Sequence, residues 1–310
     1  MDKPRVGAVG VGLLGSALTG TLLQEGYEVR AYDPDPKRVR EHEDRGGRGA
    51  SSVRSAVEGA DIVLLALPTG AIVREVCLGD DGIADSATPG TLVVDATTAR
   101  PDDSIETGQA LAERGIPFLD ASVSGSSAMA WERDIVFLVG GDDGDVARAR
   151  PMLASMARAV HHVGPPGAGA RTKLIVNLAL GIHRLALAEA LTFGEQYGMD
   201  LGRLLDVLKD SAAYSRAMDG WGDRMVTGDH GTPRSRIRQH AKDVRLMLDE
   251  GAASGAPMLL TSTMAQVLQV AQQQGLGDAD NSAVMEVLRR LAGRRKGWLG
   301  ARRSRRRQPR

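Results

Sequence analysis

Two polar side chains near the middle of the chain have the types and spacing for acid–base chemistry. Lys173 and Asn177 are four residues apart in an otherwise apolar stretch, so on a helix they share a face, one turn apart. A lysine in apolar surroundings is costly without a partner or a role. With its pKa lowered by desolvation and a nearby positive charge, the lysine could exchange a proton with an alcohol or carbonyl oxygen, and Asn177 could hold that oxygen. The alternative is a lysine that extends to solvent.

A glycine-rich motif near the N-terminus has the form of a dinucleotide-binding turn. The apolar run at residues 6–9 ends in Gly10-x-Gly12-x-x-Gly15, and a helix-like stretch follows, with Leu13 and Leu14 in its first turn. Gly10 permits the tight turn, Gly12 allows the backbone to approach a pyrophosphate, and Gly15 allows close helix packing. The positive end of the helix would then face the phosphate charge.

The acid after the second apolar run indicates which dinucleotide is bound. Asp33 follows residues 27–32 and can accept hydrogen bonds from the adenosine ribose. Asp33 and Asp35 would repel a 2′-phosphate, so we expect NAD. Lys37 and Arg38 could bind that phosphate instead, which leaves NADP possible.

A small-residue segment at positions 120–127 is a candidate substrate turn. Asp120-Ala121-Ser122-Val123-Ser124-Gly125-Ser126-Ser127 follows a predicted strand and supplies backbone N–H groups and hydroxyls without bulk. Such a turn can hold a carboxylate. The alternative is an ordinary Ser/Gly turn without a ligand.

These segments need a sheet and a helical scaffold to position them. Short β-rich runs alternate with helix-length stretches through the first half, at residues 5–9, 28–32, 62–67, 91–95, 118–120 and 135–140. The alternation predicts an α/β fold with a doubly wound, largely parallel Rossmann sheet. Ligands bind beyond the carboxyl ends of such strands, so Leu67-Pro68-Thr69 and the segment from Asp95 to Thr98 are candidate cofactor loops.

The character of the chain changes after Val163. A turn-rich hinge at 164–169 is followed by helical patterns at 172–197, 201–208, 237–250 and 258–274. The first of these is apolar nearly all round, which predicts a helix buried between neighbours. We therefore expect a dinucleotide-binding domain at 1–163, an all-α substrate and oligomerisation domain at 164–291 and a basic, disordered tail at 292–310.

Composition excludes several classes of function. The formal net charge of the 310 residues is zero, but 11 of the 39 basic residues lie in 289–310 and leave an acidic body. An acidic body argues against specific nucleic-acid binding. The single cysteine, Cys77, excludes an intrachain disulfide, and the histidines lack metal-ligand spacing, so no metal is expected. No secretory segment or membrane span is recognised, and we expect a cytoplasmic protein.

In order along the chain, these segments resemble the β-hydroxyacid dehydrogenase family, which includes 3-hydroxyisobutyrate dehydrogenases and tartronate semialdehyde reductases. The resemblance covers residues 5–288 and includes the glycine motif, the 120–125 turn, Gly167-x-Gly169-x-x-x-Lys173-Leu174-x-x-Asn177 and Lys242-Asp243. It implies that Lys173 is the catalytic lysine, that Asn177, Ser124, Gly125 and the adjoining Ser126 contact the substrate, and that Leu67, Pro68, Thr98 and Lys242 contact the cofactor. It also implies a homodimer or homotetramer.

The expected activity is hydride transfer between NAD(P) and a small β-hydroxy acid or its semialdehyde or keto partner, with Lys173 as general acid/base. The alternatives are an imine reductase and a non-catalytic dinucleotide-binding module; both groups generally lack the lysine. Arg236 and Arg238 replace residues that are usually apolar in the family. They either pair with a second anionic group of the substrate or form a solvated helix face.

Overall fold

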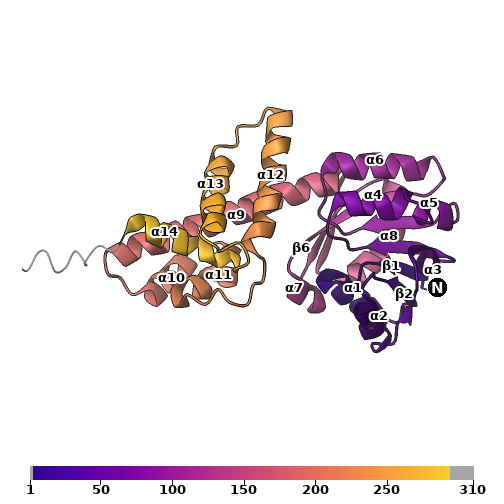
Figure 1. Ribbon diagram of the computed structural model, residues 1–310, viewed down its shortest axis with the longest axis horizontal. Coiled ribbons are helices and arrows are strands. Elements are labelled where there is room, and N and C mark those ends of the chain that lie inside the picture. The colour runs from indigo at the N-terminus through magenta and orange to yellow at the C-terminus, as the bar shows by residue number, and fades with distance from the viewer. Residues whose placement is uncertain (1–2, 294–310) are drawn as a thin grey trace, which may run out of the picture. The chain divides into compact units, whose positions relative to one another are not determined.

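A computed structural model of the chain describes residues 3–293 (Figure 1). It divides into two compact units, unit 1 up to Lys173 and unit 2 from Leu174, and the division falls inside one helix. Of the predicted basic tail, residues 294–310 lie outside the described residues.

Unit 1 is built on a single twisted sheet. Its strands are β1 (Val6–Val9), β2 (Val29–Tyr32), β3 (Arg48–Gly49), β4 (Ile62–Leu65), β5 (Leu92–Asp95), β6 (Phe118–Ser124), β7 (Val136–Gly140) and β8 (Ala159–Gly164). They lie in the order β3-β2-β1-β4-β5-β6-β7-β8, and only the β6–β7 pair is antiparallel. The first six follow the doubly wound order, which confirms the predicted Rossmann sheet.

Helices cover both faces of this sheet. One face packs against α1 (Leu13–Gln24), α7 (Ser127–Trp131) and α8 (Asp143–Met156), and the other against α3 (Val53–Val57), α4 (Gly70–Leu78), α5 (Ile83–Ser86) and α6 (Pro101–Ala112) (Figure 1). Strand β4 contributes Ile62 and Leu64 to one core, and Val63 and Leu65 to the other. This alternation is why its sequence is apolar throughout. Helix α2 (Pro36–Glu43) follows β2.

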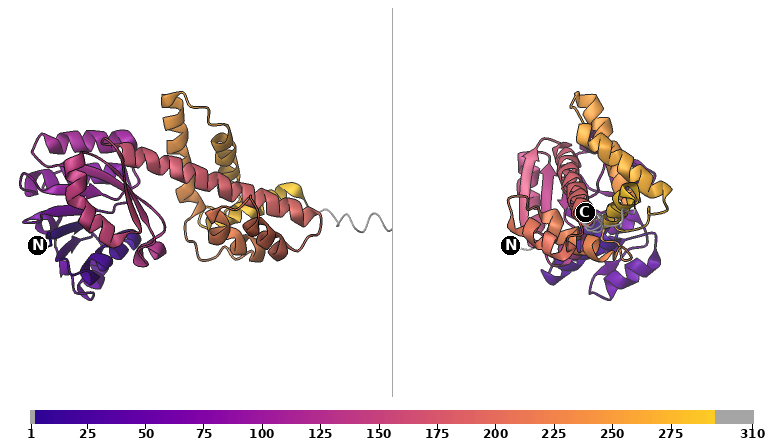
Figure 2. Two further views of the ribbon diagram at one scale, coloured as in Figure 1. Left: turned by 180° about the vertical axis from the view of Figure 1, so that it is seen from behind. Right: turned by 90° about the vertical axis from the view of Figure 1, so that its left-hand side faces the viewer.

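Unit 2 is all-helical, as predicted. It contains most of α9 (Ala168–Gln196), then α10 (Leu201–Asp210), α11 (Arg216–Thr227), α12 (Ile237–Ser254), α13 (Leu259–Gln273), the short 3₁₀ helix η1 (Asn281–Ala283) and α14 (Val284–Ala292). Helices α12 and α13 pack side by side as a hairpin (Figure 2). Helices α11 and α14 were not predicted.

The predicted burial of the long apolar helix is wrong in part. Helix α9 is long and apolar enough, by length and composition alone, to cross a membrane, yet only 33% of its most apolar window is buried. Leu174, Leu187 and Leu191 lie in the core of unit 2, whereas Ile175 and Phe193 are exposed. Apolar composition all round a helix therefore does not mean that each side is covered within one chain.

Candidate active site

The glycine motif forms the tight turn from β1 to α1. Gly10 has φ of +89°, and a Cβ there would lie 2.5 Å from the carbonyl oxygen of Ala66. A Cβ on Gly15 would overlap the carbonyl oxygen of Gly10. Gly10 is therefore required by its backbone conformation and by close packing, and Gly15 is required by close packing.

The N-terminus of α1 fits a pyrophosphate. Gly12 is the N-cap residue, has no side-chain cap, and no acid lies in the first turn. The first helical bond runs from the Ser16 N–H to the Gly12 carbonyl, so the N–H groups of Leu13, Leu14 and Gly15 have no acceptor inside the helix. Uncapped donors at the positive end of a helix form an anion site.

Asp33 connects the end of β2 to this turn. Its buried carboxylate accepts the Val11 N–H and the Asp35 N–H, both at 3.0 Å. Arg38 Nη1 lies 3.5 Å from Asp33 and Arg38 Nε lies 3.6 Å from Asp35. The arginine that could attract a 2′-phosphate is therefore already neutralised by two carboxylates.

The loops after β4 and β5 are tied together. The Leu67 N–H donates to Thr97 Oγ1 at 3.0 Å, and the Thr97 N–H donates to Asp95 Oδ1 at 2.9 Å. These bonds position the loops that contain Pro68 and Thr98 at the carboxyl ends of neighbouring parallel strands. Burial raises the pKa of Asp95 to about 7.

The predicted turn at 120–127 is shorter than expected. Residues up to Ser124 belong to β6, because the pairing of β6 with β7 extends to the pair of Ser124 and Val136. The chain turns only at Gly125, where φ is +146°. Ser126 follows as the N-cap residue of α7, and its hydroxyl accepts the Met129 N–H at 3.2 Å.

Lys173 lies near the start of α9 and is buried, with 8% of its surface exposed. The start of this helix is held by Asp120, whose two carboxylate oxygens accept the Gly167 N–H at 2.8 Å and the Ala170 N–H at 2.7 Å. Sequence reasoning did not assign a role to Asp120. The first N–H groups of a helix need acceptors, and an acid on a preceding strand can supply them. Asp120 before the glycine-rich start of α9 was therefore the signal that the sequence offered.

In unit 2, the predicted site residues Asn177 and Lys242 share one carboxylate. Asn177 Nδ2 donates to Asp243 Oδ2 at 3.4 Å, and Lys242 Nζ lies 3.6 Å from Asp243 Oδ1. Asp243 thus links α9 to α12, a role that the sequence did not reveal.

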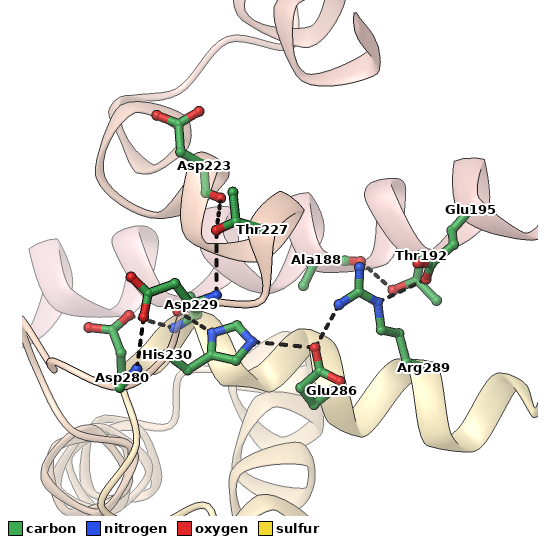
Figure 3. Close-up of polar contacts among 12 residues, drawn as sticks. Ala188, Thr192, Glu195, Asp223, Thr227, Asp229, His230, Asp280, Glu286 and Arg289 are labelled. Carbon is green, nitrogen blue, oxygen red and sulfur yellow. Dashed lines mark hydrogen bonds and ion pairs between the residues drawn. The ribbon is translucent and has the colours of Figure 1, made fainter. Parts of the chain in front are cut away.

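The segment before α12 is held by a polar network (Figure 3). His230 Nδ1 lies 2.8 Å from Ser282 Oγ, and its Nε2 lies 3.3 Å from Glu286, which also accepts from Arg289 at 2.6 Å. Arg289 donates to Glu195 on α9 at 2.9 Å. Burial raises the pKa of Glu286, but hydrogen bonds from Arg289 and His230 outweigh it and leave the pKa below its usual range.

Arg236 and Arg238 lie beside this network and face one acid. Arg236 Nε is 3.8 Å and Arg238 Nη2 is 2.6 Å from Asp278 Oδ1, and all three side chains are more than half exposed. Among residues 3–293, no group of three or more His, Cys, Asp and Glu is placed to hold a metal ion.

Comparison with known proteins identifies the family. Residues 5–164 match the NAD binding domain of 6-phosphogluconate dehydrogenase, and residues 167–288 match the NAD-binding family of NADP-dependent 3-hydroxyisobutyrate dehydrogenase. The 2-(hydroxymethyl)glutarate dehydrogenase of Eubacterium barkeri is 29% identical over 94% of this chain and 98% of its own.

Solved structures agree. The 3-hydroxyisobutyrate dehydrogenase of Mycobacterium tuberculosis with L-serine has a TM-score of 0.85 at 31% identity, covering 93% of this chain and 100% of that one. An imine reductase from Pseudomonas sp. shares only the fold, with a TM-score of 0.61 at 20% identity over 93% of this chain and 100% of that one. The chain belongs to the β-hydroxyacid dehydrogenase family and is an NAD(P)-dependent oxidoreductase of small hydroxy acids.

Proposed function

We propose that Lys173 is the general acid/base in the interconversion of a small β-hydroxy acid and its semialdehyde or keto partner. The observation that supports this role is a buried lysine on a helix whose first N–H groups are fixed by the Asp120 carboxylate. A buried amine at a fixed position can take the hydroxyl proton during oxidation and return it during reduction.

The other proposed site residues bind the substrate and orient it toward Lys173. The turn at Ser124, Gly125 and Ser126 offers N–H groups and hydroxyls to the substrate carboxylate. Asn177, held by Asp243, would contact the reacting oxygen or orient the lysine. The substrate is therefore a small carboxylate.

The cofactor-binding residues proposed are those of the glycine turn and the neighbouring loops. They are Gly10, Gly12, Leu13, Leu14, Gly15, Asp33, Leu67, Pro68 and Thr98 in unit 1 and Lys242 in unit 2. When bound, the nicotinamide supplies the hydride acceptor or donor. We also propose a dinucleotide-binding domain at 1–163, a helical domain at 164–291, assembly as a homodimer or homotetramer, and a cytoplasmic location.

The test is NAD reduction with a panel of β-hydroxy acids, comparing the wild type with Lys173→Ala. We expect kcat to fall at least about a hundredfold while NADH affinity is largely kept. Lys209→Ala, at a lysine of α10 that pairs with Asp219, is the matched control and should retain activity. Full activity of Lys173→Ala would refute the role of the lysine. Activity of the wild type on cyclic imines alone would refute the substrate class.

A further inference from the structure

The imidazole of His162, near the end of β8, is held through both of its nitrogens. Its Nε2 lies 3.0 Å from the carbonyl oxygens of both Gly141 and Gly164. A carbonyl oxygen only accepts, so Nε2 carries a proton and shares it between the two oxygens. The Nδ1 atom lies 3.2 Å from Asp143 Oδ1, but the Asp143 side chain is 95% exposed and solvent weakens that contact. The two bonds to carbonyl groups are therefore the ones that fix the ring.

These two bonds lie at an irregularity in β8. The register of β8 on β7 is regular up to His162 and resumes at Gly164, so Val163 is an extra residue between two consecutive partners on β7. Such a bulge bends its strand and changes the direction of the chain that follows. The Gly141 N–H also donates to the Gly164 carbonyl at 3.0 Å. His162 therefore fastens the far side of the bulge to the end of β7.

A short connection leads from the bulge into α9, the helix of Lys173. Gly140 is the β7 partner of Gly164. A Cβ on Gly140 would lie 2.7 Å from the Gly169 nitrogen and 2.8 Å from the Pro165 oxygen, so β7 contacts both the connection and the first turn of α9. Because these backbones pack with no side chain between them, a shift at the bulge is passed on to the start of α9.

We propose that His162 is a positioning residue for the reaction, an inference that rests on the proposed function of Lys173. By bonding both carbonyl groups, the imidazole fixes the bulge and hence the point at which the chain leaves the sheet and enters α9. It acts through the backbone, and Lys173 is the group that exchanges the proton. A misplacement of about 1 Å can cost about a hundredfold in rate, so relaxation of the bulge should lower kcat.

Two amide variants of different length test this role in the full chain, with NAD reduction by hydroxy acids as the assay. In His162→Gln the amide nitrogen can take the place of Nε2 and donate to the same carbonyl groups, whereas in His162→Asn it ends a bond short. We expect His162→Asn to lower kcat by about tenfold and His162→Gln to restore most of it. The KM for NAD should stay unchanged, because the residues of unit 1 that are proposed to bind NAD follow β1, β2, β4 and β5.

Two control variants separate positioning from stability. His161→Asn makes the same change at the neighbouring, exposed histidine and should leave kcat unchanged. Ser52→Ala removes the hydroxyl that caps α3 by accepting the Ser55 N–H at 3.1 Å. It should lower Tm by about 2–4 °C, as His162→Asn does, but leave kcat unchanged. If His162→Asn does not fold, His162→Leu fills the partly buried site without a donor and has the same expected result.

Three results would overturn the positioning role. They are a wild-type kcat in His162→Asn, a kcat in His162→Gln as low as in His162→Asn, and an equal fall of kcat in Ser52→Ala. Each can occur while Lys173→Ala is inactive, and the proposed function would then stand without this inference. Full activity of Lys173→Ala would refute the proposed function itself, and His162 would then have no base to position.

Discussion

The carboxylate of Asp120 on β6 accepts the backbone N–H of Ala170 in α9 at 2.7 Å, fifty residues further along the chain. Its second oxygen accepts the Gly167 N–H. One buried acid therefore fixes the first turn of the helix that carries Lys173, and it does so from the strand that leads to the Ser124–Gly125 turn. The proposed base and the proposed substrate turn share one structural support.

Asp120→Asn should lower kcat by about tenfold and leave the KM for NADH unchanged. The asparagine keeps one acceptor oxygen but presents an N–H donor to a backbone N–H, so the start of α9 shifts and Lys173 moves with it. Loss of the bond should also cost about 1–3 kcal/mol of stability. Steady-state kinetics and urea unfolding measure both effects.

The control is Asp142→Ala, because Asp142 caps α8 by accepting the Gly144 N–H at 2.8 Å. It should lose about 0.5–2 kcal/mol of stability, a comparable amount, without a change in kcat. Equal kinetic effects of the two variants would show that Asp120 stabilises the fold and does not position Lys173.

NADH should be preferred over NADPH by at least about tenfold in kcat/KM, or 1.4 kcal/mol. Asp33 and Asp35 already neutralise Arg38, so a 2′-phosphate would meet two carboxylates. Asp35→Ser keeps a capping oxygen for α2 but releases Arg38, and it should narrow the preference severalfold. The control is Asp44→Ser, at an exposed site at the other end of α2, which should leave the preference for NADH unchanged. A tenfold preference of the wild type for NADPH would contradict this prediction.

The parts of the site that follow from local chemistry could be predicted from the sequence. Gly10 and Gly15 are dictated by a turn whose neighbours are a few residues away or on the adjacent strand, so the spacing alone indicates them. The largely parallel, doubly wound sheet is indicated by the alternation of strands and helices. Burial of alternate β4 residues on two faces likewise follows from an unbroken apolar run.

The parts that depend on distant pairing could not be predicted. Strand β6 continues to Ser124 only because β7 pairs with it, and Asp120 gains its role only when residues 167–170 reach it. Helix α11 contains two glycines, which disfavour a helix, yet Gly222 is buried where a Cβ would meet Leu205. Tertiary packing outweighs local propensity there.

Arg236→Met/Arg238→Met should raise the KM for hydroxy acids with a second anionic group by about tenfold and leave the KM for monocarboxylates unchanged. One Asp278 carboxylate faces two guanidinium groups, so a positive charge remains at the start of α12, which has no side-chain cap or acid in its first turn. Arg245→Met, at an exposed position of the same helix, is the control. An unchanged KM for every accepted acid would assign the pair to a solvated helix face.

Asp95→Asn should change how stability depends on pH. Asp95 and Asp120 are partners in adjacent parallel strands, and both are buried. Burial raises the pKa of Asp95 from 3.8 to about 7, opposed by hydrogen bonds from Thr97 and increased by the field of Asp120. Between these values the folded state binds the proton that the unfolded state has released, so stability falls as pH rises from about 4 to 7.

Asparagine does not titrate, and its side-chain oxygen can still accept the Thr97 N–H. The stability of the wild type relative to Asp95→Asn should therefore decrease with rising pH, by at most about 1.4 kcal/mol per pH unit. Urea midpoints at pH 5 and pH 8 measure the difference. The control is Cys77→Ala, because the charge of Asp95 acts on the nearby Cys77 thiol. The stability of this variant should have the same pH dependence as that of the wild type. Parallel profiles for Asp95→Asn and the wild type would mean that this carboxylate is ionised throughout the range.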